Sequence, residues 1–377
     1  MKKRQILLII LSGLVASGAF AQSTIHLTPP TVVKWTMNGY TLDQNDLKKV
    51  NDSFAKPFQD MENELNNGPL AKLHDLSDLS KGFANANMAA FDNASLLGYQ
   101  TYDAFAVMLG FNLGIAVPSY DPSGTTRAIN DITTKGDVYA GAATGGFAGQ
   151  VGINLSFLVP KLYGTVKAGF VPSVPVNNVS YQQGMFGLGA NYTLVDPYDF
   201  VGGLFKWRGV SVGSGFTYNG ITTNLDVPIS SPGNQAFSAG TINGQAVNGF
   251  VSADNIKAKL TVNSSSFVIP VDVMTSVQAL WFLNFGLGLG VDLSFSSTKI
   301  KLAADSDLNV SGLNGATISP GSATLTATDS KGGGDFFVPR IAASVGLDVT
   351  IFKLDMPVSF YPLSKAFAIG LTGGIVW

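Results

Sequence analysis

Large apolar residues alternate with small or polar residues over several long segments of this chain. In LNFGLGLGVDLSF, residues 283–295, the odd positions are Leu, Phe or Val, and the even positions are glycine, Asn, Asp or Ser. A period of two is that of a β-strand, whose side chains point alternately to opposite faces. The pattern recurs at residues 104–117, 146–159, 186–194, 340–351 and 367–377. The chain is therefore predicted to be all-β, with strands that have one apolar face and one small, polar face.

Turns and loops separate these strands in an alternating way. Long polar segments lie at residues 121–136, 172–183, 228–255 and 303–335, whereas short turns lie at residues 160, 196–198 and 352–353. Long outer loops, short periplasmic turns and an apolar outside are typical of transmembrane β-barrels. We expect an antiparallel barrel of about ten strands. A barrel of twelve or fourteen strands is the alternative, because two of the predicted strands are long enough to contain further hairpins. The ten predicted strands are residues 103–118, 137–159, 161–171, 184–195, 204–227, 256–274, 281–302, 336–351, 353–361 and 366–377.

The N-terminal residues have the pattern of an export signal. Lys2, Lys3 and Arg4 precede an apolar run, and Ala19-Phe20-Ala21 ends it with small residues where a signal peptidase cleaves. We predict a signal peptide at residues 1–21, with an N-terminal membrane anchor as the alternative. The run is shorter than the ~20 residues that a spanning helix needs. The protein is therefore expected in the outer membrane of a Gram-negative-type envelope, in contact with its lipids.

Aromatic residues favour the same location. The chain ends in an amphipathic strand that stops at Trp377, which resembles the C-terminal signal that the barrel-assembly machinery reads in bacterial outer-membrane proteins. Trp207, Trp281 and Trp377 all fall at predicted periplasmic strand ends, where an indole ring suits the membrane–water interface. Near Gly209 the apolar phase slips by one residue, which predicts a β-bulge.

Composition argues against catalysis and against several partners. Only 13% of residues are charged and the net charge is −2, and the sequence has no cluster of basic residues that would bind nucleic acid. The chain has no cysteine, and its two histidines, His26 and His74, both precede the barrel. Neither a Ser/His hydrolase, an omptin-type protease nor a histidine zinc site can be built from barrel residues. We expect no enzyme, no metal and no cofactor. Carboxylate-only chemistry at Asp292 and Asp348 stays a distant alternative.

Residues 22–98 form a separate N-terminal region before the barrel at residues 99–377. An apolar stripe with helical spacing follows a candidate capping box at Thr41 and Gln44, with Pro57 inside it. A small-residue segment comes next. These two parts predict either a periplasmic helical hairpin that packs on itself or a plug inside the barrel. The stripe consists of Leu42, Leu47, Val50, Phe54, Phe58, Met61 and Leu65. The candidate plug residues are Gly82, Phe83, Asn85, Asn87 and Asp92.

A family resemblance rests on this small-residue segment. The order Gly-Phe-Ala-Asn-Ala at residues 82–86, Ala89-Ala90, Asp-Asn-Ala at residues 92–94 and a first strand near Tyr102 is similar to the hatch and first strand of FadL-type long-chain fatty-acid transporters. The glycine-rich whole also resembles the barrel surface proteins of spirochaetes. The first resemblance implies a hatch that leads hydrophobic substrate from an outer pocket to an opening in the wall.

Four charged residues have the inward phase of the predicted strands: Lys167, Arg340, Asp292 and Asp348. They are predicted to line the lumen, either as paired structural ions or as the lining of a small polar pore. The sequence thus predicts a barrel that mediates passage of small or hydrophobic solutes, as a channel or a FadL-like transporter. The alternative is a surface-exposed binding, adhesin or structural barrel without transport.

Overall fold

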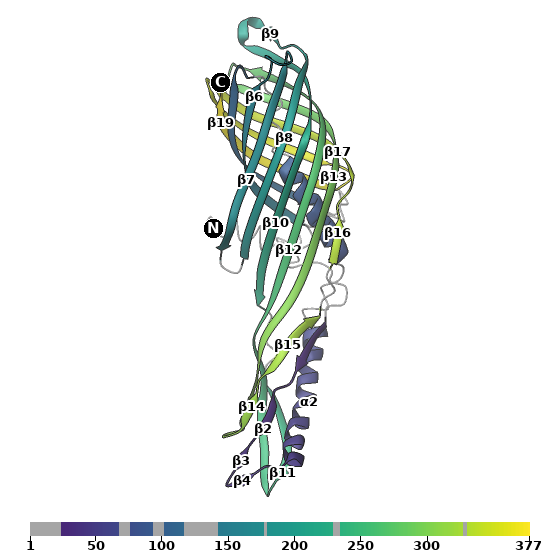
Figure 1. Ribbon diagram of the computed structural model, residues 1–377, viewed down its shortest axis with the longest axis vertical. Coiled ribbons are helices and arrows are strands. Elements are labelled where there is room, and N and C mark those ends of the chain that lie inside the picture. Colours follow the sequence, from purple (N-terminus) through teal and green to yellow (C-terminus); the bar gives the residue numbers. More distant parts are fainter. Residues whose placement is uncertain are drawn as a thin grey trace.

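Ten antiparallel strands close into a barrel in this computed structural model, which describes residues 24–67, 76–92, 102–116, 142–176, 179–228, 234–326 and 330–377. Each barrel strand pairs with the next, and the last pairs with the first (Figure 1). The predicted all-β fold and the number of ten strands are confirmed. The barrel strands are β5 (Phe105–Ala116), β6 (Ala142–Asn154), β7 (Leu162–Val176), β8 (Val179–Val195), β10 (Phe205–Pro228), β12 (Gln245–Ala279), β13 (Leu283–Ser311), β17 (Phe337–Val349), β18 (Phe352–Tyr361) and β19 (Ala366–Val376).

The exterior of the barrel is an apolar surface. Along β13, Leu287 and Leu289 are 62% and 65% exposed, whereas Asp292 on the opposite phase is fully buried. The same division holds on β5, β6, β8, β17 and β19, whose large apolar residues face outward. A soluble protein rarely exposes so large an apolar patch, but a membrane barrel requires one. The strands therefore cross a membrane. Neither described helix is long and apolar enough to do so.

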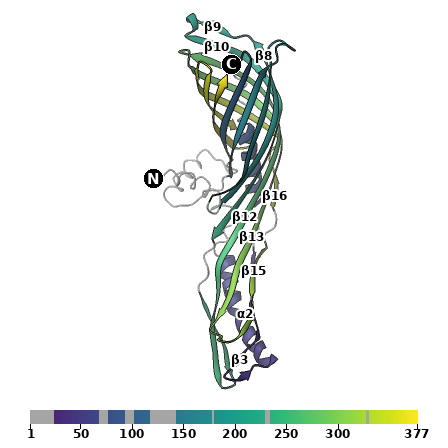
Figure 2. The same ribbon diagram turned by 60° about the vertical axis from the view of Figure 1, so that its left-hand side comes forward.

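Two strands continue far beyond the barrel. β12 has 35 residues and β13 has 29, whereas a strand needs only about 9–11 residues to cross a bilayer. They stay paired with each other from Phe250↔Ser311 to Ala279↔Leu283 and carry a second body, here called the head (Figures 1 and 2). Besides the far ends of β12 and β13, the head contains β1 (Thr24–Thr28), β2 (Thr31–Lys34), β3 (Thr36–Met37), β4 (Tyr40–Thr41), α2 (Gln44–Asn67), β11 (Gln235–Ile242), β14 (Thr317–Ser319) and β15 (Gly321–Thr326).

The apolar stripe of α2 forms the core of the head. Phe54 is fully buried and makes an edge-to-face contact with Phe237 of β11, with 4.6 Å between ring centroids. The rest of the stripe packs with Val251 and Leu308, from the far ends of β12 and β13. The helix is capped by Asp43, whose Oδ1 accepts from the backbone N–H groups of Asn45 and Asp46, both at 2.9 Å. The cap is therefore not the predicted pair of Thr41 and Gln44.

Two expectations about loops and helices are wrong. The polar segments at residues 172–183, 228–255 and 303–335 are largely strands: the ends of β7 and β8, then β11, β14, β15, β16 (Ser330–Gly333) and the extensions of β12 and β13. The helices do not form a hairpin, since α2 packs in the head and α3 (Leu76–Asp92) packs against barrel strands. The predicted signal peptide and the predicted loop at residues 121–136 lie outside the described residues. The division of the chain at residues 21 and 98 stays a prediction.

The two ends of the barrel differ in their connections. At the end that holds Trp377, consecutive strands are joined through residues 155–161, 196–204, 280–282 and 350–351, with β9 (Tyr198–Phe200) and the 3-10 helix η2 (Val201–Gly203) in one of them. The turn at Leu280 and Trp281 is tight, and both residues have a positive φ. We call this end the inner mouth. The head lies beyond the opposite end, the outer mouth (Figure 1).

Candidate functional site

The helix α3 occupies the lumen of the barrel. It contacts β5, β6, β10, β12, β13, β16 and β19, which together surround it. From Gly82 to Asp92 every residue is buried. The five candidate plug residues all belong to this stretch: Gly82, Phe83, Asn85, Asn87 and Asp92. The small side chains of α3 allow this fit, because a barrel of this size is nearly filled by its own wall side chains.

Glycines in the wall make room for the helix. A Cβ atom added to Gly114 would lie 2.1 Å from the carbonyl oxygen of Ala86. One added to Gly146 would lie 2.4 Å from the ring of Phe91, and one added to Gly334 would lie 2.7 Å from Oδ1 of Asn85. Real Cβ atoms essentially never lie so close to another atom, so these three glycines permit the close approach of α3 to β5, to β6 and to the residue that follows β16. Inner-face glycine here accommodates a helix.

The inner end of α3 is held by a buried ionic cluster. Arg340 of β17 donates through Nη1 to Asp92 and through Nη2 to Asp272 of β12. The hydroxyl of Tyr361 donates to Asp92 Oδ2 at 3.0 Å and to the carbonyl of Ala89 at 3.4 Å. Removing one partner of such a buried pair leaves an uncompensated charge, which is strongly destabilising. Arg340 therefore links the helix to two wall strands, β17 and β12, which flank β13.

Two more predicted lumen residues lie beside this cluster. Asp292 of β13 and Lys167 of β7 are buried and lie within electrostatic reach of Asp92 and Arg340. No group of three or more His, Asp or Glu in the described part of the chain has a geometry that could hold a metal ion.

The outer end of α3 is held by a second contact. Asn85 Nδ2 donates to Asp335 Oδ2 at 2.9 Å, and the backbone N–H of Asp335 donates back to Asn85 Oδ1 at 2.9 Å. Lys81 Nζ lies 2.9 Å from Asp335 Oδ1. Asp335 lies just before β17, outside the membrane-spanning part. Burial alone would raise the pKa of Asp335, but the hydrogen bonds from Lys81 and Asn85 lower this pKa below its ordinary value.

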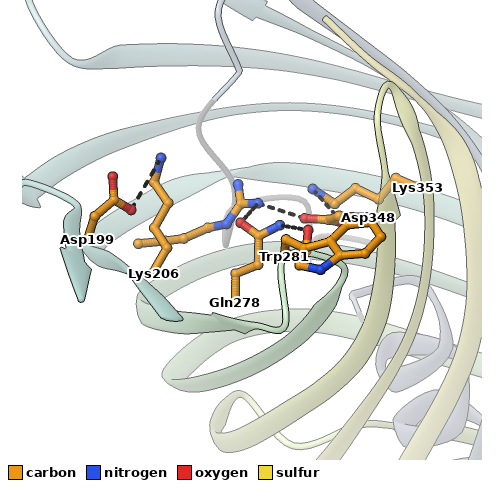
Figure 3. Close-up of polar contacts among 7 residues, drawn as sticks. Asp199, Lys206, Gln278, Trp281, Asp348 and Lys353 are labelled. Carbon is orange, nitrogen blue, oxygen red and sulfur yellow. Dashed lines mark hydrogen bonds and ion pairs between the residues drawn. The ribbon is translucent and has the colours of Figure 1, made fainter. Parts of the chain in front are cut away.

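A third polar cluster lines the inner mouth (Figure 3). Arg208 Nη2 donates to Asp348 Oδ2 at 2.7 Å and to Gln278 Oε1 at 3.1 Å, and Lys353 Nζ lies 3.4 Å from Asp348 Oδ1. Gln278 Nε2 donates to the carbonyl of Trp281 at 2.6 Å, which supports the tight turn. Asp348, a predicted lumen residue, thus belongs to a different cluster from Arg340.

The predicted bulge explains why Arg208 was missed. The register of β10 against β12 shifts between Trp207 and Val210, and Gly209 has a φ of 78°. A Cβ at this glycine would lie 1.9 Å from the carbonyl oxygen of Val195. This shift lets Arg208 join the polar cluster of Asp348. Lys353, Asp272 and Tyr361 were also missed. Each of these three residues occupies a lumen-facing position in the alternation of its strand, and this position could have identified it from the sequence.

The three predicted interface tryptophans lie near the inner mouth. Trp281 and Trp377 are 66% and 62% exposed. Trp207 is half-buried and donates from Nε1 to Thr275 Oγ1 at 2.7 Å. Tyr198 and Phe200 of β9 add an exposed aromatic pair at the same end. Exposed aromatic rings at the end of an apolar barrel suit a membrane boundary.

The closed barrel, its apolar exterior and its lumen helix define a transmembrane β-barrel protein of the outer-membrane type. The chain belongs to the Lsa36-like family, whose model matches residues 36–377. None of the curated proteins matches it.

Solved barrels are similar to this chain at low identity. The translocator domain of the autotransporter NalP from Neisseria meningitidis shares 11% identity over 79% of this chain and 99% of that chain, with a TM-score of 0.34. The P. putida toluene transporter TodX shares 9% identity over 74% and 92%, with a TM-score of 0.23. The CymD monoaromatic hydrocarbon channel shares 9% identity over 80% and 97%, also with a TM-score of 0.23.

Proposed function

We propose that this protein displays the head on the outer surface of the outer membrane, as a surface-exposed binding or structural protein, while the barrel anchors it. One observation carries the proposal: α3 is buried in the lumen and held to the wall at both ends, by Arg340 and by Asp335. A barrel closed in this way serves better as an anchor than as an open pore.

The direction of the barrel supports an outer location for the head. Short connections and the chain end mark the periplasmic side of such barrels, and longer connections mark the external side. Here every connection at the end with Trp377 is short, from residues 350–351 up to residues 196–204, whereas the connections between β10 and β12 and between β13 and β17 at the other end contain whole strands of the head. Most of β12, 35 residues long, is then outside the membrane. An assembly this large outside the bilayer suits recognition of a partner, which usually resides in exposed parts of a scaffold.

Passage of small or hydrophobic solutes is the second function that we propose. Asn219 of β10 and Ser266 of β12 are paired neighbours that are buried on the lumen face. No side-chain nitrogen or oxygen of these two residues, or of Asn87 on α3, has a partner among the described residues. Buried polar groups need water or a polar solute to satisfy them. A water-filled path beside α3, lined by these polar groups, would allow solutes to pass. Movement of α3 would widen this path.

Two further parts of the proposal concern partners and chemistry. The barrel-assembly machinery would recognise β19 with its terminal Trp377, and lipid would cover the apolar exterior. We also propose that the protein is not an enzyme. Within the described residues, His26 is exposed in the head and lies 3.2 Å from Glu62, far in sequence from the lumen clusters.

Surface labelling tests the display of the head. The chain has no cysteine, so each introduced thiol is unique. Lys48→Cys places a thiol on α2, at a side chain that is 74% exposed, and Asp199→Cys places one at the inner mouth, at a side chain that is 59% exposed. A membrane-impermeant maleimide should label position 48 in intact cells and position 199 only after the outer membrane is permeabilised. The reverse order would refute the display of the head.

Step conductance tests the second function. The purified protein in planar bilayers should be silent if α3 stays in place. Frequent steps with the unmodified protein would favour a channel over a closed anchor.

A further inference from the structure

We propose that the barrel is the export route for the chain's own N-terminal head, which crosses the outer membrane through the lumen before α3 comes to rest there. This inference rests on the proposed outer location of the head. It adds an activity to the barrel, because the protein then completes its own secretion instead of only anchoring a domain.

The path of the chain carries the inference. The head contains residues 24–67, and α3 begins at Leu76 near the outer mouth, where Ser80 approaches Gly332 of β16. The helix ends at Asp92 in the ionic cluster of Arg340. Tyr102 then lies buried in the inner mouth, where its hydroxyl donates to the carbonyl of Gly164 at 3.2 Å. The described residues before β5 therefore lie, in sequence order, in the head, in the lumen and in the inner mouth.

The first strand begins where this path ends. The backbone N–H groups of Ala104 and Phe105 both donate to the carbonyl of Trp377, so β5 starts beside the chain end at the inner mouth. The covalent connection from α3 to β5 thus joins Asp92, buried in the lumen, to Tyr102, buried in the inner mouth. For a chain that is exported into the periplasm, this order of head, lumen and inner mouth supports passage of the residues before α3 inside the barrel wall.

The width of the lumen sets the form in which the head passes. The lumen holds one helix, and even this helix needs Gly114, Gly146 and Gly334 to fit. A folded head of several strands and a 24-residue helix is much wider than that. The head must therefore cross as an extended or locally helical chain and fold afterwards.

The residues that form the head core come together only on the outer side of the membrane, which supports folding of the head after it has crossed. Phe54 and Met61 of α2 are fully buried against residues of β11, β12 and β13, such as Phe237 and Val251. These partners are extensions of barrel strands that reach the outside when the barrel inserts. Before it crosses, the stripe of α2 has none of these partners. Burial of large apolar side chains stabilises the folded head, so folding outside opposes return of the chain.

Two fusions test passage through the lumen. A small domain that contains one internal disulfide is placed between the signal peptide and Thr24, and the matched control has both of its cysteines changed to serine. An epitope in the β3–β4 turn at Gly39 reports the N-terminal part of the head. A second epitope in the β11–β12 turn at Gly244 reports the strand extensions. Both glycines have a positive φ and open space around them.

The disulfide-locked fusion should lose antibody binding at Gly39 on intact cells, and the serine control should regain it. Loss of both epitopes in the locked fusion, with recovery of both in the control, would also support passage, because a blocked lumen then blocks assembly. Equal display or equal retention of the Gly39 epitope in the two fusions would overturn the inference. If neither epitope of the unfused protein is reached from outside, the proposed display of the head fails instead.

Discussion

Arg340 of β17 binds the carboxylate of Asp92, the last residue of α3, inside the barrel. The same guanidinium also binds Asp272 of β12, so one side chain joins the lumen helix to two wall strands. All three side chains are at least 95% buried. A charge in such surroundings depends on its partners, and the position of α3 therefore depends on Arg340.

Arg340→Ala should release the inner end of α3. Loss of one partner from a buried ionic cluster typically destabilises by about 3–5 kcal/mol, because Asp92 and Asp272 lose their shared cation. We expect unfolding at a lower urea concentration and step conductance in planar bilayers. Arg208→Ala removes the same charge at the inner mouth and should leave the bilayer silent. Unchanged unfolding and silent bilayers for Arg340→Ala would contradict the role of this contact.

Gly114→Ala should weaken the packing of α3 against β5. The added Cβ would lie 2.1 Å from the carbonyl oxygen of Ala86 and 2.7 Å from the backbone nitrogen of Ala90. Overpacking of this kind usually costs about 1–3 kcal/mol. The matched control is Gly184→Ala on β8, where the new Cβ meets nothing within 4 Å. Heat-modifiable migration on gels should occur at a lower temperature for Gly114→Ala only. A shared shift would show that α3 does not limit the stability.

Phe54→Ala should destabilise the head and spare the barrel. Phe54 is fully buried, and its truncation removes the edge-to-face contact with Phe237. Phe→Ala changes in a core cost about 3–5 kcal/mol. Limited proteolysis should cut α2 much faster, with unchanged heat-modifiability of the barrel. Lys56→Ala, on the exposed face of the same helix, should behave like the unmodified protein. Loss of barrel stability in Phe54→Ala would contradict the separation of the two cores.

Acid should loosen the outer end of α3. The pKa of Asp335 is lowered in the folded protein, so its ionised form stabilises α3 above the ordinary carboxyl pKa of about 4. That contribution is lost as the pH falls from about 4 through the lowered folded-state pKa. The protection of the α3 amides, taken as the exchange rate relative to the intrinsic rate at the same pH, should therefore fall below about pH 4. Asp335→Asn should remove this part of the pH dependence. An identical pH profile in both proteins would refute the contribution of Asp335.

The barrel could be predicted from sequence because each strand carries its own signal. From Leu283 to Phe295, lipid-facing and lumen-facing positions alternate without interruption. This strand can therefore be predicted from its own residues, without knowing which strands pair with it. The bulge at Gly209 is visible for the same reason, as a slip in that alternation. Buried ions such as Arg340 follow from the phase of their strands.

The head could not be predicted in this way. Its core joins the stripe of α2 to isolated apolar residues such as Phe237, Val251 and Leu308, which lie among Ser, Thr, Asn and Gly more than 150 residues later. Each of these residues alone fits an ordinary polar loop. These residues belong to strands because they all pack against Phe54 and its neighbours on α2, and that contact cannot be read from the local sequence. The position of α3 likewise depends on pairs that are far apart, such as Asn85 and Asp335.

The position of α3 inside the barrel is tested most directly by a disulfide between α3 and β16 at the outer mouth. Ser80→Cys and Gly332→Cys would place their Cβ atoms about as far apart as a disulfide requires, since the existing Cβ of Ser80 lies 3.0 Å from the Cβ position of Gly332 and a small shift reaches ~3.8 Å. The chain contains no other cysteine. In native outer membranes, the double variant should oxidise and show no reactive thiol, while each single variant keeps one. Two reactive thiols in the oxidised double variant would contradict a helix inside this barrel.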